Sequence, residues 1–361
     1  MNPRLQQLRQ LGQSLWLDNI TRDLLDSGTL AHYIAEFGLT GLTSNPTIFD
    51  EAIGNSSSYD AAIRDPKVQG LDPEALFLEL ALDDLRRAAD LFRPAHDASG
   101  GVDGWVSMEL SPLLASDTAS SIEAAARIHR QAARDNLYIK IPGTPEGVPA
   151  IEESIFNGVP INVTLLFSAA QYQAVAEAYM RGIERRLQAG RDPVVDSVAS
   201  LFVSRWDKAI ADKVPEPLRN RLGIAIGQRT YRAYRELLAS PRWTALAKAG
   251  ARTQRLLWAS TSTKDPSAPD TLYLSALAAP DTIDTVPEKT LKAFADHGEL
   301  HGAMREDGGD AESTLAQFTQ AGIDIDALAT KLQQDGAESF VTSWRQLMQR
   351  ITDKSRQVNP A

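Results

Sequence analysis

The sequence predicts a closed (β/α)8 barrel, the TIM-barrel fold, followed by a C-terminal helical extension. Eight short apolar runs alternate with longer helical patterns, which is the sequence sign of βα units and of a parallel sheet. Polar residues within several runs fall on one side of the expected strand and near its C-terminal end, as they do inside a barrel. An open, doubly wound sheet is the alternative, and the count of eight runs favours the barrel.

The expected strands and helices follow one another along the chain. The apolar runs are residues 15–18, 39–44, 105–110, 136–143, 160–166, 194–203, 255–261 and 282–286. Two of the helices between them show core-facing stripes at helical spacing: Leu78, Leu82, Leu85, Ala89 and Phe92 in the first, and Tyr172, Ala176, Tyr179, Ile183 and Leu187 in the second. Ser168 and Gln171 are spaced as a capping box for the second helix.

Two segments stand outside this alternation. Residues 50–73 are rich in Ser, Asn, Asp and Pro, and we expect a surface excursion there. From residue 288 onward the pattern is helical, with breaks expected at the loop 302–310, at Gly322 and at Gly336. We therefore expect a catalytic barrel over residues 1–287 and a helical extension over 288–361 that packs on the same domain.

Charge and composition exclude several classes of protein. A chain of 361 residues with 43% hydrophobic content can build one large single-domain barrel or two ordinary domains. Its net charge of -10 argues against nucleic acid or an anionic membrane as the main partner, because both select basic surfaces. The chain has no cysteine, which excludes disulfides and thiolate nucleophiles and is compatible with the cytoplasm, the location we expect.

Nothing in the sequence predicts a metal site or a membrane segment. His297 and His301 are four residues apart, but Gly298 and Gly302 disfavour a helix there, so we expect no metal pair. Residues 1–13 are polar, and no run of about 18 apolar residues follows. The sequence leaves both a monomer and a homodimer open.

The run 136–143 places one lysine inside a β-favouring segment. Leu137, Ile139 and Ile141 would lie on one face of the strand, with Tyr138 and Lys140 on the other. Lysine is seldom fully buried, and an amine removed from water loses its proton more readily and becomes a nucleophile for carbonyl carbons. An edge strand with its lysine in solvent is the alternative.

Polar residues on the neighbouring strands would share the layer of this lysine. They are Asp18 on the first strand, Thr43 and Asn45 on the second, Ser107 and Glu109 on the third, and Asn162 and Thr164 on the fifth. Each lies near the C-terminal end of its strand, where barrel enzymes place their active sites. Five strands in succession thus present groups suited to acid/base chemistry around an amine.

Each of these residues also has a structural explanation. Asp18 could cap a helix, and Asn45 could form an Asx turn before Pro46. Asn162 and Thr164 could form a satisfied polar ladder. Glu109 and Lys140 could be a buried structural ion pair. None of these explanations accounts for the convergence of all the residues on one layer.

The motifs resemble those of transaldolases over nearly the whole chain. The matching runs are LWLDNI with Asp18, GLTSNPTIF with Asn45, VSMELSP with Glu109, YIKIPGTPEG with Lys140, INVTLLFS with Asn162 and Thr164, and SLFVSRWD with Ser200, Phe202 and Arg205. The extended C-terminus is similar to that of the longer bacterial branch of the family. The resemblance implies a (β/α)8 barrel with a Schiff-base lysine on the fourth strand.

The resemblance also implies a reaction that needs no cofactor. A dihydroxyacetone unit would pass from sedoheptulose 7-phosphate to glyceraldehyde 3-phosphate, giving erythrose 4-phosphate and fructose 6-phosphate, as in the non-oxidative pentose phosphate pathway. Lys140 would attack the C2 ketone, and Asp18 would take the proton of the C4 hydroxyl. Glu109 would shuttle protons through a water held with Thr164. The partners would be small sugar phosphates.

Substrate-binding residues follow from the same resemblance. Asn45 and Asn162 would hold substrate hydroxyls, and Ser200 and Phe202 belong to the same pocket. Arg205, just past the sixth strand, fits the phosphate-binding arginine of the family; a surface arginine is the alternative. Familiar members have a second arginine after the seventh strand, where this chain has Ser260, Ser262 and Lys264. Lys264 would replace that arginine as a point charge.

Two other functions remain open for such a barrel. Aldolases that use the same Schiff base release free dihydroxyacetone, but the resemblance gives them a glutamine in place of Glu109 and a tyrosine in place of Phe202. The second is a phosphosugar-binding regulatory protein, which would have lost one or more of the catalytic positions. This chain keeps all of them.

Overall fold

Eight parallel strands close into a barrel in the computed structural model, which describes residues 1–359. The strands are β1 (Ser14–Asp18), β2 (Gly41–Thr43), β3 (Trp105–Glu109), β4 (Leu137–Pro142), β5 (Ile161–Leu166), β6 (Ser197–Phe202), β7 (Arg255–Ala259) and β8 (Thr282–Val286). Each strand pairs with its neighbours in sequence, and β8 pairs with β1. The predicted (β/α)8 barrel is confirmed, and every predicted run overlaps one strand.

Three predicted runs were wrong by two or more residues at one end: β2 begins two residues after 39, β6 begins three residues after 194, and β7 ends two residues before 261. Before β6, the N–H of Val195 donates to the carbonyl of Pro193 at 3.0 Å, a tight turn that delays the strand. After β7, Ser260 has a φ of 57°, a left-handed conformation that ends the extended run.

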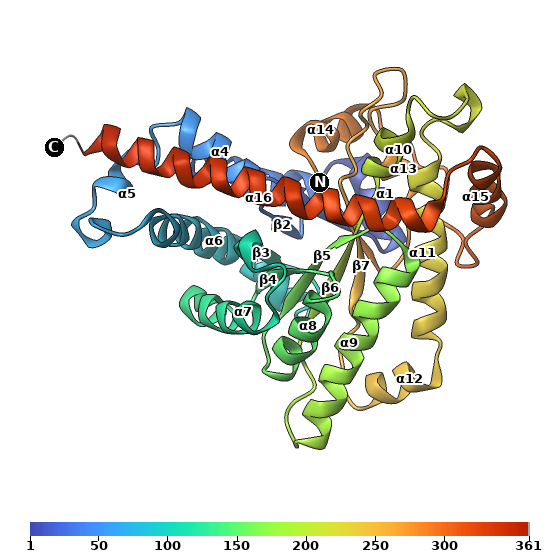
Figure 1. Ribbon diagram of the computed structural model, residues 1–361, viewed down its shortest axis with the longest axis horizontal. Coiled ribbons are helices and arrows are strands. Elements are labelled where there is room, and N and C mark those ends of the chain that lie inside the picture. Colours follow the sequence, from blue (N-terminus) through green and yellow to red (C-terminus); the bar gives the residue numbers. More distant parts are fainter. Residues whose placement is uncertain (360–361) are drawn as a thin grey trace.

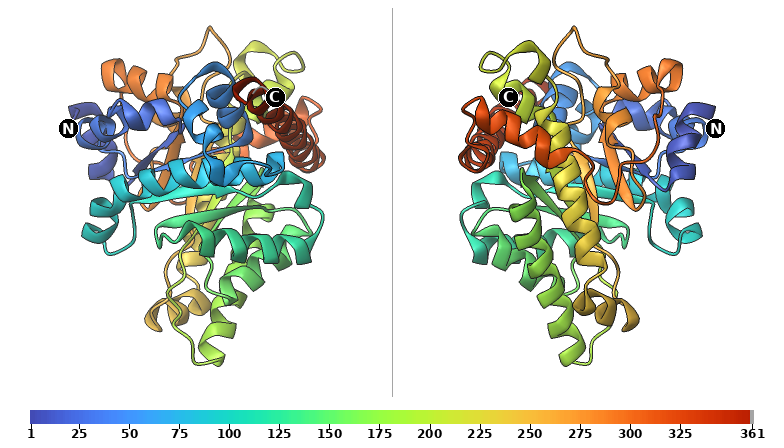
Figure 2. Two further views of the ribbon diagram at one scale, coloured as in Figure 1. Left: turned by 90° about the vertical axis from the view of Figure 1, so that its left-hand side faces the viewer. Right: turned by 90° about the vertical axis from the view of Figure 1, so that its right-hand side faces the viewer.

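Helices surround the barrel (Figures 1 and 2). Up to β6 they are α1 (Pro3–Leu11), α2 (Arg22–Asp26), α3 (Thr29–Phe37), α4 (Pro46–Asn55), α5 (Asp60–Arg64), α6 (Pro73–Ala98), α7 (Thr118–Ala132), α8 (Gly147–Phe156) and α9 (Ala169–Gln188). After β6 they are α10 (Ser204–Ile210), α11 (Leu222–Leu238), α12 (Pro241–Lys248), α13 (Leu272–Ala276), α14 (Glu288–His297), α15 (Ala311–Gln320) and α16 (Ile325–Val358). None of these helices combines the length and the apolar character needed to cross a membrane.

The two predicted stripes face the core in α6 and α9. All residues of the two stripes are buried except Leu78 and Leu187, one in each stripe, which are half-buried. Ser168 caps α9 by accepting the N–H of Gln171 at 3.1 Å. The side chain of Gln171 accepts the N–H of Phe167 at 2.7 Å, one residue before the position that a capping box requires.

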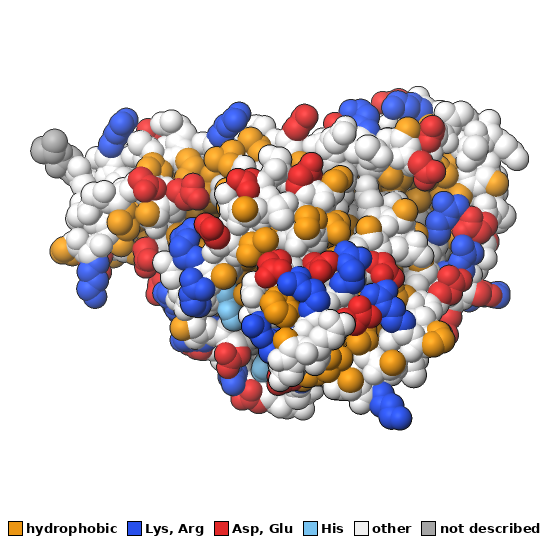
Figure 3. Space-filling view, turned by 60° about the horizontal axis from the view of Figure 1, so that its bottom comes forward, with side chains coloured by type: hydrophobic (Ala, Val, Ile, Leu, Met, Phe, Trp, Pro, Cys, Tyr) orange, Lys and Arg blue, Asp and Glu red, His pale blue; other side chains and the backbone are white. Residues whose placement is uncertain are grey.

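Surface charges are mixed in sign. On the face in Figure 3, basic and acidic side chains lie intermingled. Ion pairs between neighbouring helices are one cause of this pattern. Arg185 of α9, for example, pairs with Glu153 of α8 at 2.8 Å.

Aromatic side chains fill the barrel beneath its C-terminal end. Tyr138 stacks on Trp105 with ring centroids 4.0 Å apart, and Trp16 lies 6.0 Å from Tyr138. Gly41 makes room for this layer, because a Cβ there would lie 2.6 Å from the indole nitrogen of Trp16. Since side chains alternate along a strand, the aromatic faces of β1, β3 and β4 are also the faces of Asp18, Glu109 and Lys140. The polar layer therefore rests on a packed apolar floor.

Helix α16 crosses the mouth of the barrel (Figures 1 and 2). The expected break at Gly336 was wrong, because α16 continues through it as one helix of 34 residues. The expected breaks at 302–310 and at Gly322 do fall between helices. The excursion 50–73 contains the end of α4, all of α5 and the short 3-10 helix Pro66–Val68, and it lies beside the outer half of α16. The last two residues of the predicted extension, 360 and 361, lie outside the described residues.

Asp284 of β8 is a fully buried carboxyl on the outer face of the barrel. Its Oδ1 accepts the hydroxyl of Thr261 at 2.9 Å, and its Oδ2 has no partner among residues 1–359. Burial raises the pKa of Asp284 to about 8. The folded protein therefore holds a proton on Asp284 in the pH range where the unfolded chain has released it.

We predict that Asp284→Asn removes part of the pH dependence of stability. Because the folded pKa is the higher one, the parent should lose stability as pH rises from about 4 to 8, by up to about 1.4 kcal/mol per pH unit. The asparagine cannot ionise and does not lose this stability. The free energy of unfolding of the variant minus that of the parent should therefore increase as pH rises over that range. Urea unfolding at pH 5, 6, 7 and 8 measures this difference. The exposed Asp135→Asn is the control, and a difference that stays constant for Asp284→Asn contradicts the prediction.

Candidate active site

A polar cavity of about 190 Å³ lies at the C-terminal ends of the strands. Ten of the eleven predicted site residues line it: Asp18, Asn45, Lys140, Asn162, Thr164, Ser200, Phe202, Arg205, Ser260 and Lys264. The eleventh, Glu109, contacts Lys140 from the neighbouring strand. The residues that the alternation of single strands placed on one layer are thus together in space.

Lys140 is buried at the floor of this cavity. Its side chain is 8% exposed, and its Nζ lies 2.6 Å from the carboxylate of Glu109. Nζ also donates to the carbonyl of Ser44, just past β2, at 2.7 Å. A closed barrel has no edge strand, which excludes the solvent-facing alternative for this lysine.

Glu109 is a carboxyl with a shifted proton affinity. Burial raises the pKa of Glu109 above its ordinary value, and the ammonium group of Lys140 opposes this effect. The buried ion pair between Lys140 and Glu109, which the sequence left open as a structural explanation, is therefore present. It lies against a cavity, however, where a carboxyl with a raised pKa can exchange a proton with a bound ligand.

Asp18 lies across the cavity from this pair, at the end of β1. Burial raises the pKa of Asp18, and the charge of Lys140 together with the hydroxyl of Thr43 acts against the shift. Thr43 donates to Asp18 Oδ1 at 3.1 Å, and Thr43 and Thr285 share a hydrogen bond of 2.9 Å. Asp18 does not cap α2, because Thr21 does so. Two carboxyls with raised pKa values thus flank one amine.

A chain of hydrogen bonds joins three strands beside Lys140. Ser200 of β6 donates to Asn162 Oδ1 at 2.7 Å, and Asn162 Nδ2 donates to Ser107 of β3 at 3.1 Å. The structural explanation, a polar ladder with its hydrogen bonds satisfied, therefore holds for Asn162. It does not include Thr164, whose buried hydroxyl has no partner among residues 1–359. Thr164 is free to bind a ligand or a water.

Asn45 serves two purposes. Its Oδ1 accepts the N–H of Ile48 at 3.1 Å and caps α4, so Asn45 does have the structural role before Pro46 that the sequence left open. Its amide nitrogen donates to no acceptor among the described residues, and the side chain lines the cavity. The cap fixes the side-chain oxygen of Asn45 and leaves its side-chain nitrogen available to donate to a ligand.

A cationic end of the cavity lies at the start of α10 and in the loop after β7. Arg205 is half-buried, and no carboxylate within residues 1–359 forms an ion pair with it. Burial lowers the pKa of Lys264; the charges of Lys208 and Arg205 act in the same direction, and that of Asp18 opposes them. The hydroxyls of Ser204 and Ser260 lie 3.0 Å apart at this end. Such a cluster attracts an anion.

Sequence reasoning missed Ser44 beside the lysine and, in the cavity wall, Thr285, Pro287 and Phe340. The alternation of residues 282–286 contained a signal for Thr285, because this residue shares the inner face of β8 with Ile283. No local pattern could reveal Phe340. It reaches the cavity only because α16 crosses the mouth of the barrel.

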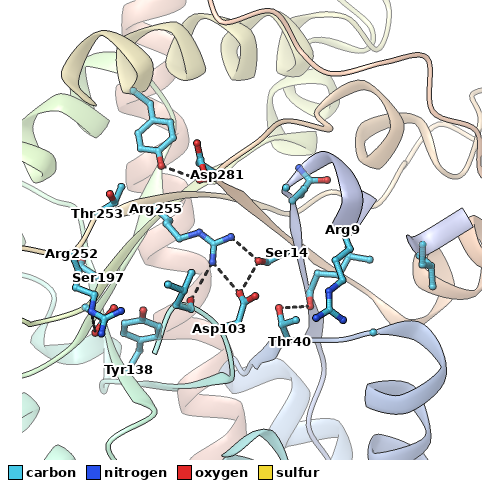
Figure 4. Close-up of a pocket in the computed structure, with 18 of the residues that line it drawn as sticks. Arg9, Ser14, Thr40, Asp103, Tyr138, Ser197, Arg252, Thr253, Arg255 and Asp281 are labelled. Atoms are coloured by element: carbon cyan, nitrogen blue, oxygen red, sulfur yellow. Dashed lines mark hydrogen bonds and ion pairs between the residues drawn. The ribbon is translucent and has the colours of Figure 1, made fainter. Parts of the chain in front are cut away.

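A larger cavity of about 520 Å³ lies at the opposite, N-terminal end of the barrel (Figure 4). The guanidinium of Arg255 points into it, donates to Ser14 at 2.6 Å and to the carbonyl of Thr282 at 2.9 Å, and pairs with Asp103 at 3.1 Å. The protein itself thus satisfies this charge. Barrel enzymes carry their chemistry at the C-terminal face, and we place the active site in the smaller cavity.

Comparison with known proteins agrees with this geometry. The family model described as transaldolase/fructose-6-phosphate aldolase matches residues 15–351. A transaldolase of Frankia alni is 44% identical over 98% of this chain and 98% of its own length, and one of Thermobifida fusca is 43% identical over 98% and 99%. A transaldolase of Thiobacillus denitrificans is 43% identical over 95% and 98%. The chain, with its lysine at the floor of a closed barrel, belongs to the transaldolase/fructose-6-phosphate aldolase family.

Proposed function

We propose that this enzyme transfers a dihydroxyacetone unit from sedoheptulose 7-phosphate to glyceraldehyde 3-phosphate through a Schiff base on Lys140. The products are erythrose 4-phosphate and fructose 6-phosphate, which assigns the enzyme to the non-oxidative pentose phosphate pathway. The observation that supports this proposal best is a buried amine in contact with a carboxyl of raised pKa, in a cavity that also holds an arginine with no counter-ion among residues 1–359.

Schiff-base formation begins with Lys140. Glu109, 2.6 Å away, accepts a proton from the ammonium, and the freed amine attacks C2 of the ketose. The carbinolamine then loses its hydroxyl as water, for which Glu109 returns the proton. Thr164, whose hydroxyl has no partner within the described part of the chain, holds a relaying water. The result is a protonated imine between Lys140 and C2.

Carbon–carbon cleavage follows on this imine. Asp18 removes the proton of the C4 hydroxyl, the C3–C4 bond breaks, and its electron pair moves to the iminium nitrogen to give an enamine. The aldose phosphate leaves. The enamine carbon then attacks the aldehyde of the acceptor, and Asp18 returns its proton to the new hydroxyl. The raised pKa of Asp18 suits a group that both takes and gives a proton.

Neutral and cationic groups share the binding of the substrate. Asn45, Asn162 and Ser200 orient the hydroxyls of the sugar, since uncharged groups can do so without forming an ion pair with the amine. Arg205 and Lys264 bind the phosphate, with Ser260 beside them. Phe202 supplies an apolar wall whose ring lies 5.0 Å from the Arg205 guanidinium carbon.

Fructose 6-phosphate aldolase belongs to the same family, and its reaction differs in the fate of the enamine. An aldolase releases free dihydroxyacetone, whereas a transaldolase holds the enamine until an acceptor arrives. The residues Glu109 and Phe202 favour transfer, because the resemblance gives such aldolases glutamine and tyrosine at these positions. A purely sugar-binding protein would have no need of the carboxyls around Lys140.

We also propose small sugar phosphates as the partners, without nucleic acid or a membrane, and the cytoplasm as the location. The net charge of -10 supports the absence of polyanionic partners. Both a monomer and a homodimer are compatible with a site that one chain builds.

We predict transfer that depends on both an acceptor and Lys140. Fructose 6-phosphate with erythrose 4-phosphate should give sedoheptulose 7-phosphate and glyceraldehyde 3-phosphate, and Lys140→Met should reduce the rate to background because no imine can form. Mass spectrometry of the sugars measures both products. Release of free dihydroxyacetone without an acceptor would instead identify an aldolase. Absence of either reaction would rule out the proposed function.

We predict that Glu109→Gln lowers kcat about 100-fold with a smaller change in KM, because the amide keeps the shape but cannot shuttle protons. The pH profile of kcat should also lose the limb due to Glu109. Steady-state kinetics between pH 5 and 9 measures both effects. Glu123→Gln, at an exposed position of α7, is the matched control. A variant that keeps the rate and the profile of the parent would exclude Glu109 as the proton shuttle.

A further inference from the structure

Helix α16 is fixed to the strands that carry the catalytic residues. The side-chain amide of Gln333 donates to the carbonyl of Gly143, just after β4, at 3.0 Å and to that of Leu165 in β5 at 2.9 Å. Leu165 has a φ of 58°, where the ladder between β5 and β6 shifts register, so its carbonyl needs a partner outside the sheet. These two bonds set the height and the rotation of α16 above the cavity.

One turn further along, Gly336 lies against Arg205. A Cβ at this position would be 3.1 Å from Nη1 of Arg205 and 2.9 Å from a methyl group of Leu165. Glycine is unfavourable in the interior of a helix, because it loses more conformational freedom than other residues. The close approach of the guanidinium to the helix backbone explains its presence here.

Phe340 follows Gly336 by four residues and therefore lies on the same face of α16. Its ring centroid is 5.9 Å from Cζ of Arg205, and that of Phe202 is 5.0 Å from the same atom. Phe340 also lines the cavity that contains Lys140. Two aromatic rings and the backbone at Gly336 thus enclose the guanidinium.

This enclosure orients a charge without neutralising it. Within residues 1–359, Arg205 forms no ion pair and no hydrogen bond with a protein acceptor. A planar guanidinium in a fixed orientation presents its N–H groups to an anion in bidentate geometry with little further loss of freedom. Its affinity for a phosphate should therefore depend on the residues that hold it.

We propose that Gly336 and Phe340 of α16 are positioning residues that orient Arg205 and so set the preference for phosphorylated over unphosphorylated substrates. The inference rests on the proposed function, since it assigns a role to α16 in that same site. Neither residue needs to touch the reacting atoms. Their effect acts on the phosphate end of the substrate and leaves the chemistry at Lys140 unchanged.

The test compares two acceptors with sedoheptulose 7-phosphate as the common donor: glyceraldehyde 3-phosphate, which gives fructose 6-phosphate, and glyceraldehyde, which gives fructose; erythrose 4-phosphate leaves in both reactions. In a reaction with two half-reactions, kcat/KM for the acceptor does not depend on the donor step. We expect Gly336→Ala and Phe340→Leu each to lower kcat/KM for glyceraldehyde 3-phosphate about 10-fold, mainly through KM. The value for glyceraldehyde should stay within about 2-fold of the parent, because this acceptor has no phosphate. Ser339→Ala, on the exposed side of the same turn, is the matched control.

A double-mutant cycle identifies the residue through which α16 acts. Arg205→Met should itself abolish most of the preference for the phosphorylated acceptor. If Gly336 acts through Arg205, adding Gly336→Ala to Arg205→Met should cause little further loss. Independent, additive losses would overturn the proposal.

Two other results would also overturn it: equal losses for both acceptors, which indicate a merely structural role of α16, or no change in the preference. Thermal unfolding midpoints show whether Gly336→Ala folds, and Phe340→Leu provides the test if it does not. Failure of the proposed function is recognised separately, because the parent would then transfer to neither acceptor.

Discussion

The ion pair between Lys140 and Glu109 is the interaction on which the site depends. A buried pair of this kind contributes little net stability, because removing two charges from water offsets most of their attraction. The barrel supports it with neutral donors and acceptors around it and a floor of stacked aromatic rings below. A fold that encloses an amine and a carboxyl at 2.6 Å beside an open cavity is organised for proton transfer.

Closure of the barrel makes this arrangement possible. Parallel strands bring their C-terminal ends to one rim, so each strand can add a group to the same layer. The two ends of the cavity then differ in charge: acid/base groups surround Lys140, while Arg205 and Lys264 lie at the other end. A sugar phosphate, with a carbonyl at one end and a dianion at the other, matches this polarity. Helix α16 covers the rim and encloses the guanidinium of Arg205.

The rule of alternation explains how much of this the sequence could predict. Period-two patterns were enough to place Asp18, Lys140 and Asn162 on one layer, because each pattern lies within a single strand. Family motifs supplied Arg205, which follows its strand and has no local pattern of its own. The rule that glycine breaks helices failed at Gly336, because that rule is local and the reason for this glycine is a contact with a distant side chain. Phe340 escaped prediction for the same reason.

The proposed mechanism requires that Lys140 forms the covalent intermediate. Incubation of the protein with fructose 6-phosphate and borohydride, followed by mass spectrometry and peptide mapping, tests it most directly, with Lys140→Met as the control. The account predicts a reduced dihydroxyacetone adduct on Lys140 and none in the control. No adduct, or an adduct on another lysine, would contradict it.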